Sequence, residues 1–185
     1  PYFSHCIAVA STLANWKMDT TTIIAGLLHD TVEDTEATLD DLVKYFGNDL
    51  GNLVDGLTKI SEISYSSRKE KQVGNFMKML LSVAQDMRVI IIKFADRLHN
   101  METIKHMPHI KRHRIAIETR DIYVPLAHRF GMSTVKSQLE DLVLGVLNPS
   151  GFKEIESKVK SSERQREKFI KKVIEPVNKE LKRYD

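Results

Sequence analysis

Apolar residues recur every three or four positions along most of this chain, and that periodicity constrains the fold more than any other feature of the sequence. Such spacing places them on one face of an α-helix, whereas a half-buried strand would alternate apolar and polar residues. Glycine and proline, which punctuate loop-rich folds, number only 8 and 5 among 185 residues. The sequence therefore predicts an all-α fold, a helical bundle around one substantial core.

The predicted helices span residues 4–17, 20–31, 38–46, 49–60, 67–84, 87–101, 109–129, 134–147 and 152–184. The run RVIIIKF has the composition of a buried strand, but Asp86 to Met101 contains no turn signal, so we expect a buried helix there. Thr38 and Asp41 predict a capping box at the start of one helix, and Gly47 suits its end.

A turn cluster, NPSG at residues 148–151, predicts a domain boundary. We expect one domain over residues 1–150. The following segment, 151–185, includes KVKSSERQREKFIKK, which is more typical of a solvated helix or connector than of a binding patch. The sequence thus predicts a charged helical connector after the domain.

Composition limits the function classes. The 28 basic and 25 acidic residues are mixed along the chain and leave a formal charge of +3, a weak basis for nucleic-acid binding. Cys6 is the single cysteine, so an internal disulfide is excluded, and we expect a small buried residue there rather than a nucleophile. No segment reads as a signal peptide or a membrane span, so a cytoplasmic location is expected.

The stretch LLHDTVEDTE carries four polar residues at the edge of an apolar helical turn: His29, Asp30, Glu33 and Asp34. Burying them is costly unless something compensates, such as a metal ion. Residues four apart share a helix face, so His29 is expected near Glu33, and Asp30 near Asp34. A His-Asp pair by itself is more typical of a helix cap or a surface hydrogen bond than of a metal site, and Glu33 and Asp34 at this spacing strengthen the metal interpretation.

A second polar face follows farther along the chain. Asp96, Asn100 and Thr103 fall at i, i+4 and i+7, on one side of the predicted helix. An ion pair with Arg97 is the alternative for Asp96, and the other two residues also suit an ordinary helix surface. His5, in an otherwise apolar helix, is a third candidate ligand.

Two imidazoles and two carboxylates from separate helices would form one mixed site at His5, His29, Asp30 and Asp96. Such ligands suit Mn, Fe or Zn better than Mg or Ca. Glu33 and Asp34, beside these ligands, could orient or deprotonate a metal-bound water.

A competing cluster occurs in KHMPHIKRH, where His106, His109 and His113 have spacings compatible with a metal. Pro108 interrupts the helix between the first two, and the neighbouring lysines and arginines oppose cation binding. A basic rim that contacts phosphates, or simply a solvated helix start, fits this segment better.

Several blocks resemble a known family in order and spacing: HDTVEDT, LVDGLTKI, NFMKMLLSVAQDMRVIIIKFADRLHNM and ETRDIYVPLAHRFGM. Together they look like the hydrolase domain of the Rel/Spo family, the bacterial enzymes that make and destroy guanosine tetra- and pentaphosphate alarmones. That family belongs to the HD superfamily of metal-dependent phosphohydrolases. The resemblance implies an HD-type helical bundle with a metal site between its helices.

The resemblance also implies the activity, removal of the 3′-pyrophosphate from (p)ppGpp to give GDP or GTP and pyrophosphate, as part of the stringent response. By carry-over, Mn²⁺ would bind at His5, His29, Asp30 and Asp96. Glu33 and Asp34 would activate the attacking water. Asn100 and Thr103 would contact the nucleotide, and Met107 would line the base pocket.

The chain departs from the family pattern at two places. A basic stretch with a guanine-stacking arginine usually precedes the segment that matches PYFSH, so we expect the sequence to begin inside a longer, N-terminally truncated domain. The first histidine is usually followed by proline, whereas Cys6 stands here. Because residues 152–185 resemble the connector towards the synthetase domain, we expect a fragment of a bifunctional synthetase/hydrolase.

Two alternatives stay open. An HD phosphohydrolase acting on other nucleotides would use the same ligands. A catalytically silent module that binds nucleotide and signals to an adjoining domain would keep the fold without the reaction.

Overall fold

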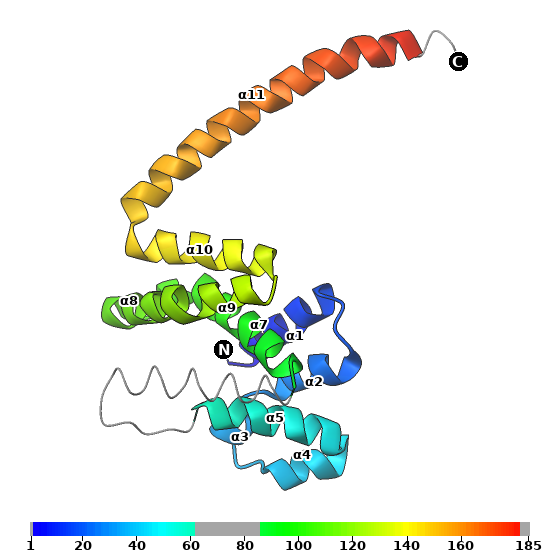
Figure 1. The fold of residues 1–185 in the computed structure, drawn as a ribbon, viewed down its shortest axis with the longest axis vertical. Coiled ribbons are helices and arrows are strands. Elements are labelled where there is room, and N and C mark those ends of the chain that lie inside the picture. The colour runs from blue at the N-terminus through cyan, green and yellow to red at the C-terminus, as the bar shows by residue number, and fades with distance from the viewer. Residues whose placement is uncertain (1, 62–85, 182–185) are drawn as a thin grey trace.

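The computed structural model describes residues 2–61 and 86–181, and every regular element in these ranges is a helix, as predicted (Figure 1). The helices before the gap are α1 (Tyr2–Asn15), α2 (Thr20–Leu28), α3 (Thr31–Asp34), α4 (Leu39–Phe46) and α5 (Asn48–Ser61). After it come α7 (Arg88–Glu102), η1 (Ile104–His106), α8 (His109–Glu118), η2 (Thr119–Tyr123), α9 (Val124–Arg129), α10 (Ser133–Leu147) and α11 (Pro149–Leu181). The helix predicted over 67–84 lies outside the described residues.

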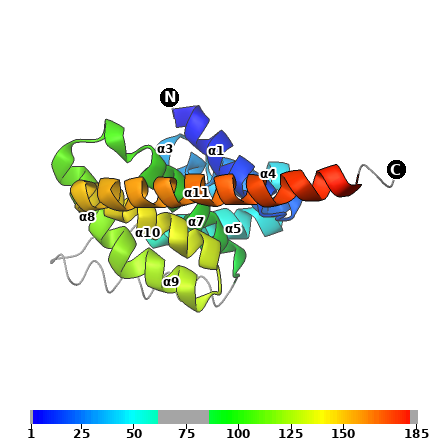
Figure 2. The same cartoon turned by 90° about the horizontal axis from the view of Figure 1, so that it is seen from above.

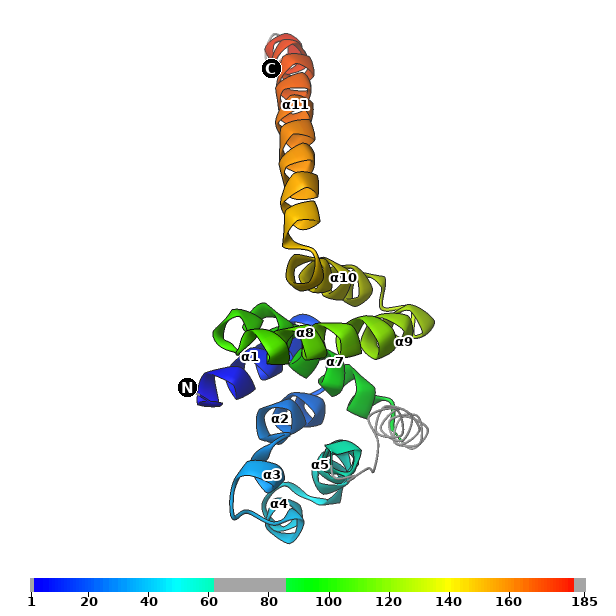
Figure 3. The same ribbon diagram turned by 90° about the vertical axis from the view of Figure 1, so that its left-hand side faces the viewer.

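Helix α7 occupies the centre of the bundle. It packs against α1, α2 and α5 on one side and α10 on the other (Figure 3). Seven apolar side chains of this helix are buried: Val89, Ile90, Ile92, Phe94, Ala95, Leu98 and Met101. Burial on both sides explains why RVIIIKF reads as a strand by composition, and the helix predicted there is confirmed.

The predicted capping box is confirmed at the start of α4. Asp41 N donates to Thr38 Oγ1, and Thr38 N donates to the Asp41 carboxylate. Gly47 ends the helix with a positive φ of 88°, which favours glycine. Among the described helices, none combines the length and apolarity needed to cross a bilayer.

Residues 109–129 were predicted as one helix and form one rod whose middle turn, η2, is π-helical. Pro125 lacks an N–H and its ring would clash with the carbonyl four residues earlier in an α-helix. The wider π-turn, closed by the hydrogen bond from Val124 N to the Thr119 carbonyl, lets the chain continue through this proline.

The turn expected over 148–151 is shorter in the structure. Asn148 alone separates α10 from α11, and its Oδ1 accepts from Gly151 N at 3.0 Å, which caps the new helix. Pro149 suits the first helical position because its missing N–H would have had no partner there. Helix α11 packs on α10 near this turn and then extends away from the bundle (Figure 1), and seen from above it runs across the other helices (Figure 2).

Arg97 links α7 to the α8–α9 rod. Its Nη2 donates to Glu118 Oε1 at 3.2 Å, and its guanidinium lies 4.0 Å from the ring centroid of Tyr123. The Arg97 side chain is only 13% exposed. Because a buried guanidinium is costly unless paired, these contacts hold the central helix and the rod in one arrangement.

Gly26 permits a close crossing of α1 and α2. A Cβ at this position would clash with the buried Leu13 side chain of α1. The missing side chain therefore sets how near the two helices lie, and with them the polar residues that they carry.

We expect Arg97→Ala to lower the free energy of unfolding by about 2 to 4 kcal/mol, since it removes the cation–π contact and the partner of Glu118. Urea denaturation followed by circular dichroism measures this change. Arg120→Ala is the control, because Arg120 pairs with Asp121 on the surface and its loss should leave stability unchanged. Equal effects of the two substitutions would contradict this role of Arg97.

We expect Gly26→Ala to lower the free energy of unfolding by about 1 to 3 kcal/mol, because the new methyl group overpacks the helix crossing. Gly145→Ala in α10 is the matched control. A Cβ there meets Phe152 Cγ at an ordinary 4.0 Å, so the substitution should stabilise by about 0.5 to 1 kcal/mol. The same denaturation experiment on both variants tests the opposite signs.

Candidate metal centre

His29 is the most buried polar residue of the site. It follows the last turn of α2 and is 0% exposed. Its Nδ1 donates to the Gly26 carbonyl at 2.8 Å, and since a carbonyl only accepts, the proton sits on Nδ1. The Nε2 lone pair is left facing the bundle interior, where it can bind a cation.

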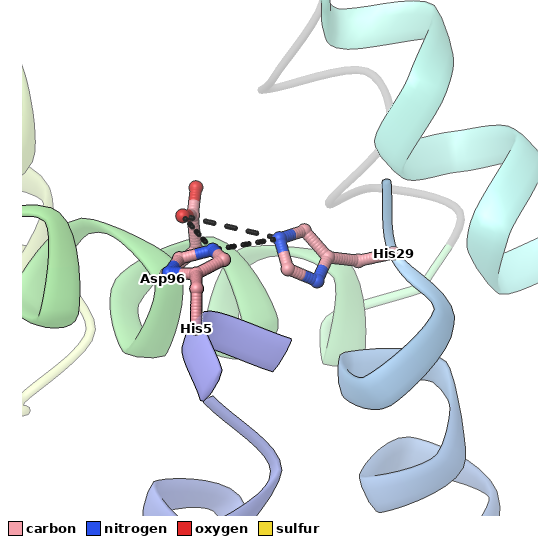
Figure 4. A group of neighbouring side chains, drawn as sticks. All are labelled: His5, His29 and Asp96. Atoms are coloured by element: carbon pink, nitrogen blue, oxygen red, sulfur yellow. Dashed lines mark hydrogen bonds and ion pairs between the residues drawn. The ribbon is translucent and has the colours of Figure 1, made fainter. Parts of the chain in front are cut away.

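His5 and Asp96 meet His29 from two other helices. His5 Nε2 lies 3.4 Å from His29 Nε2 and 3.3 Å from Asp96 Oδ1, and His29 Nε2 lies 3.9 Å from that oxygen. Figure 4 shows the three side chains pointing towards one another. Their donor atoms all lie within 4.8 Å of one another, the only such group of three or more in the described ranges.

Two of these spacings, those from His5 Nε2 to His29 Nε2 and to Asp96 Oδ1, fit two ligands of a single metal ion, and the 3.9 Å from His29 Nε2 to Asp96 Oδ1 is wider. For bonds of about 2.1 Å, two ligands at about 90 to 109° are separated by roughly 3.0 to 3.4 Å. Two imidazole nitrogens and a carboxylate oxygen are ligands that first-row divalent metals accept. The three residues therefore form a candidate divalent-metal site.

Asp30 lies at the margin of this group. Its Oδ2 is 3.0 Å from His29 Nε2, but the compact group does not include it. Asp30 precedes α3, and its side chain makes no capping hydrogen bond to that helix. Its carboxylate lies towards His29 instead, in a position to add a second oxygen.

The ionisation states favour a cation. Burial raises the pKa of Asp96, but the hydrogen bond with His5 and the charges of Lys93, His29 and Arg97 outweigh it and lower that pKa to about 2. Burial lowers the pKa of His29, but the hydrogen bond with Asp30 and the charges of Asp30 and Asp96 outweigh it, so the pKa of His29 is raised above its ordinary value. Asp96 is thus ionised at neutral pH, and the site carries negative charge around two imidazoles.

The expectation that LLHDTVEDTE forms one helix is wrong, although the predicted spacing of Asp30 and Asp34 is kept by the hydrogen bond from Asp34 N to the Asp30 carbonyl. Helix α2 ends at Leu28, and Asp30, with φ −104° and ψ 1°, breaks the helix before the single turn of α3. Glu33 and Asp34 therefore sit on a separate turn and are exposed. Their backbone N–H groups both donate to the Asp30 carbonyl, at 3.1 and 2.9 Å, which joins this turn to the candidate ligand.

Asp34 lies close enough to α1 to act on it electrostatically. Burial, and then the carboxylates of Asp30, Asp34 and Asp96, raise the pKa of the Cys6 thiol next to His5. Cys6 is 8% exposed, a small buried residue as expected. One of the two expected water-activating carboxylates thus acts electrostatically on the residue next to His5.

The expected nucleotide contacts lie along and beyond α7. Asn100 Nδ2 donates to Asp96 Oδ1 at 2.6 Å, and Thr103 Oγ1 donates to the His99 carbonyl at 2.8 Å. Met107 is half-buried against the core, and its carbonyl accepts from Arg112 Nε. Asn100 is therefore next to the candidate metal ligands, while Met107 lies one turn beyond Thr103. Arg97 pairs with Glu118 rather than with Asp96, although its charge still acts on that carboxylate.

His99 is a site residue that the sequence reasoning missed. Its Nδ1 lies 2.7 Å from His5 Nδ1, and burial, followed by the nearby His5, lowers its pKa. A sequence signal existed, because His99 falls three residues after Asp96 and so shares its helix face.

The competing histidines form no compact ligand group in the part of the chain that the structure describes. The His109 and His113 rings are 6.2 Å apart and line a cavity of about 680 Å³ between α7, α8, α10 and α11. None of the predicted metal ligands or nucleotide contacts lines this cavity. It is separate from the candidate metal centre.

Comparison with known proteins places this geometry in a family. The model of the HD domain family matches residues 1–133. A GTP pyrophosphokinase of Myxococcus xanthus is 46% identical over 184 residues, which are 98% of this chain and 24% of that protein. The bifunctional (p)ppGpp synthase/hydrolase SpoT of Escherichia coli K12 is 42% identical over 181 residues, 98% of this chain and 26% of that protein.

A solved structure of similar fold is that of a metazoan ortholog of SpoT, which hydrolyzes ppGpp and plays a role in starvation responses. It aligns with a TM-score of 0.63 and 27% identity over 80% of this chain and 83% of that one. The chain spans about a quarter of the length of the two bacterial relatives. The match over residues 1–133, most of the chain, shows that this protein belongs to the HD domain family.

Proposed function

We propose that this chain is a metal-dependent hydrolase that removes the 3′-pyrophosphate of guanosine tetra- and pentaphosphate, giving GDP or GTP and pyrophosphate. The observation that carries the proposal is the meeting of His5, His29 and Asp96 from three helices. The substrate is suggested by relatives named as (p)ppGpp synthase/hydrolase and by the ppGpp-hydrolyzing metazoan structure.

We assign Mn²⁺ to His5, His29, Asp30 and Asp96. Two neutral imidazoles and two carboxylates balance the charge of a divalent ion, and the mixed nitrogen and oxygen ligands suit manganese. A bound divalent ion lowers the pKa of a coordinated water and neutralises negative charge on the phosphates. The short separation of Asp30 Oδ2 from His29 Nε2 supports Asp30 as the fourth ligand.

We assign to Glu33 and Asp34 the role of general base, which removes a proton from the attacking water. One of their carboxylates accepts that proton while the water oxygen bonds to the phosphorus attached to the ribose O3′. The bond between this phosphorus and O3′ breaks, and O3′ takes up a proton. The backbone hydrogen bonds from Glu33 and Asp34 to the Asp30 carbonyl support the role, because they keep both residues within one helical turn of a proposed ligand.

Asn100, Thr103 and Met107 are assigned to the nucleotide. Asn100 uses one N–H of its amide on Asp96, so its second N–H and its carbonyl oxygen are available to a substrate. Thr103 retains acceptor lone pairs while donating to the His99 carbonyl. Met107 offers a flexible apolar side chain that suits a planar base.

We further propose that α11 leads towards a synthetase domain in the same polypeptide, with the hydrolase domain over residues 1–150 and the connector over 151–185. The bacterial relatives are about four times longer than the matched region, and one is bifunctional by name. The extension of α11 away from the bundle supports the connector role (Figure 1). A cytoplasmic enzyme of the stringent response is the setting that this proposal implies.

The first test measures pyrophosphate release from ppGpp by the 185-residue chain with Mn²⁺. We expect turnover that EDTA abolishes, and that Asp96→Asn lowers at least ~100-fold, because even residues around a metal ligand typically contribute about 10- to 100-fold. Asp40→Asn, an exposed carboxylate on α4, is the control and should retain full activity.

A nucleotide panel in the same assay separates the alternatives. Faster cleavage of nucleotides that lack a 3′-pyrophosphate would favour a broader phosphohydrolase. Tight ppGpp binding without turnover would favour a silent regulatory module. Turnover that survives both EDTA and Asp96→Asn would overturn the proposal.

The second test replaces both proposed proton acceptors, in the double variant Glu33→Gln and Asp34→Asn. Turnover should fall about 10²- to 10⁴-fold, the usual contribution of a general base, while calorimetric Mn²⁺ affinity stays within a few-fold of the wild type. Loss of Mn²⁺ binding in this variant would instead show that these carboxylates are ligands.

A further inference from the structure

His99 is the one histidine near the candidate metal centre with no role in the proposed reaction. It projects from α7, between Asp96 and Asn100, and its ring meets that of His5. The two Nδ1 atoms are 2.7 Å apart, the ring centroids are 4.7 Å apart, and the rings are tilted by 55°. This contact is a hydrogen bond between two imidazoles, so one proton lies between them.

The direction of that hydrogen bond follows from the other nitrogen of His5. Nε2 is the atom that faces His29 and Asp96, and it must present a lone pair to bind a cation. The proton of a neutral His5 therefore belongs on Nδ1, which donates to His99. His99 accepts at its own Nδ1 and carries its proton on Nε2.

We propose that His99 is a positioning residue, which fixes the tautomer and the ring orientation of His5 in the metal site. The inference rests on the proposed function, because it requires that the site bind a metal. It concerns a different property of the site, namely why His5 presents Nε2 rather than Nδ1.

The hydrogen bonding of His29, the other histidine of the site, supports this role because it follows the same pattern. His29 donates its Nδ1 proton to the Gly26 carbonyl, which leaves Nε2 for the cation. Histidines that ligate metals usually have such an outer partner. His99 occupies the corresponding place for His5, with an imidazole nitrogen where His29 has a carbonyl oxygen.

The helical spacing within α7 places His99 on the same face as Asp96, next to His5. Asp96 and His99 are three residues apart on one face, so a single helical turn carries both a proposed ligand and the group that orients another. Asn100, four residues after Asp96, holds that carboxylate from the same turn. The position of His5 relative to Asp96 is therefore set by α7 as well as by α1.

The test compares Mn²⁺ affinity, measured by calorimetry, in the wild-type chain, His99→Phe, His99→Gln and the control His113→Phe. Phenylalanine keeps the ring volume without an acceptor, so His99→Phe should bind about 10- to 100-fold more weakly. Glutamine supplies a carbonyl acceptor and should recover most of the affinity. His113 lies in exposed α8, so its replacement should have no effect.

A second readout reports the tautomer directly. Nitrogen-15 NMR of histidine-labelled wild-type chain with Zn²⁺, a diamagnetic probe, should show the His5 proton on Nδ1, and His99→Phe should broaden or shift that signal. This wild-type spectrum can overturn the proposal even if His99→Phe fails to fold, and His99→Gln then supplies the variant comparison. A proton on His5 Nε2, or metal bound through Nδ1, would overturn the proposal.

The outcomes separate the two proposals. If the wild type binds no Mn²⁺ or Zn²⁺, the proposed metal-dependent function fails and this inference fails with it. If the wild type binds and His99→Phe binds equally well with an unchanged His5 signal, the metal site stands and only the positioning role is wrong.

Discussion

The fully buried imidazole of His29 is the constraint on which the rest of this structure depends. A buried polar ring needs a partner for each nitrogen, and here Nδ1 meets the Gly26 carbonyl, while the lone pair of Nε2 faces the carboxylates of Asp30 and Asp96 and needs a proton or a cation between them. His29 occupies this position where α2 ends, next to the break at Asp30 and where α2 packs against α7. The close crossing of α1 and α2 at Gly26 then brings His5 into the same space.

The electrostatics of the cluster extend outward through α7. Lys93 and Arg97, on either side of Asp96 in sequence, help to keep its carboxylate ionised. Arg97 in turn contacts Glu118 and Tyr123 in the outer rod. The central helix thus couples the candidate metal centre to the layer from which α10 and α11 continue, because its buried charges need partners on both sides.

Much of the fold was predictable because it depends on periodicity and local chemistry. The buried helix at RVIIIKF and the capping box at Thr38 follow from spacing within one segment. The relation of His29 to Glu33 was not predictable in this way, since one backbone break at Asp30 ends the helical register. The π-turn before Pro125 was not predicted either. A proline within a predicted helix is compatible with a break, a kink or a wider turn, and the local sequence does not distinguish them.

By itself the sequence determined the all-α class, the helical faces, and a short set of polar residues that are costly to bury alone. Those properties depend on residues close together along the chain, because helical spacing predicts which of them lie on the same face. Only the tertiary structure decided that His5, His29 and Asp96 meet, that Asp30 lies at their margin, and that His99 rather than His106 contacts His5. These relations join helices up to 94 residues apart, and their distances depend on how whole helices pack rather than on any local pattern.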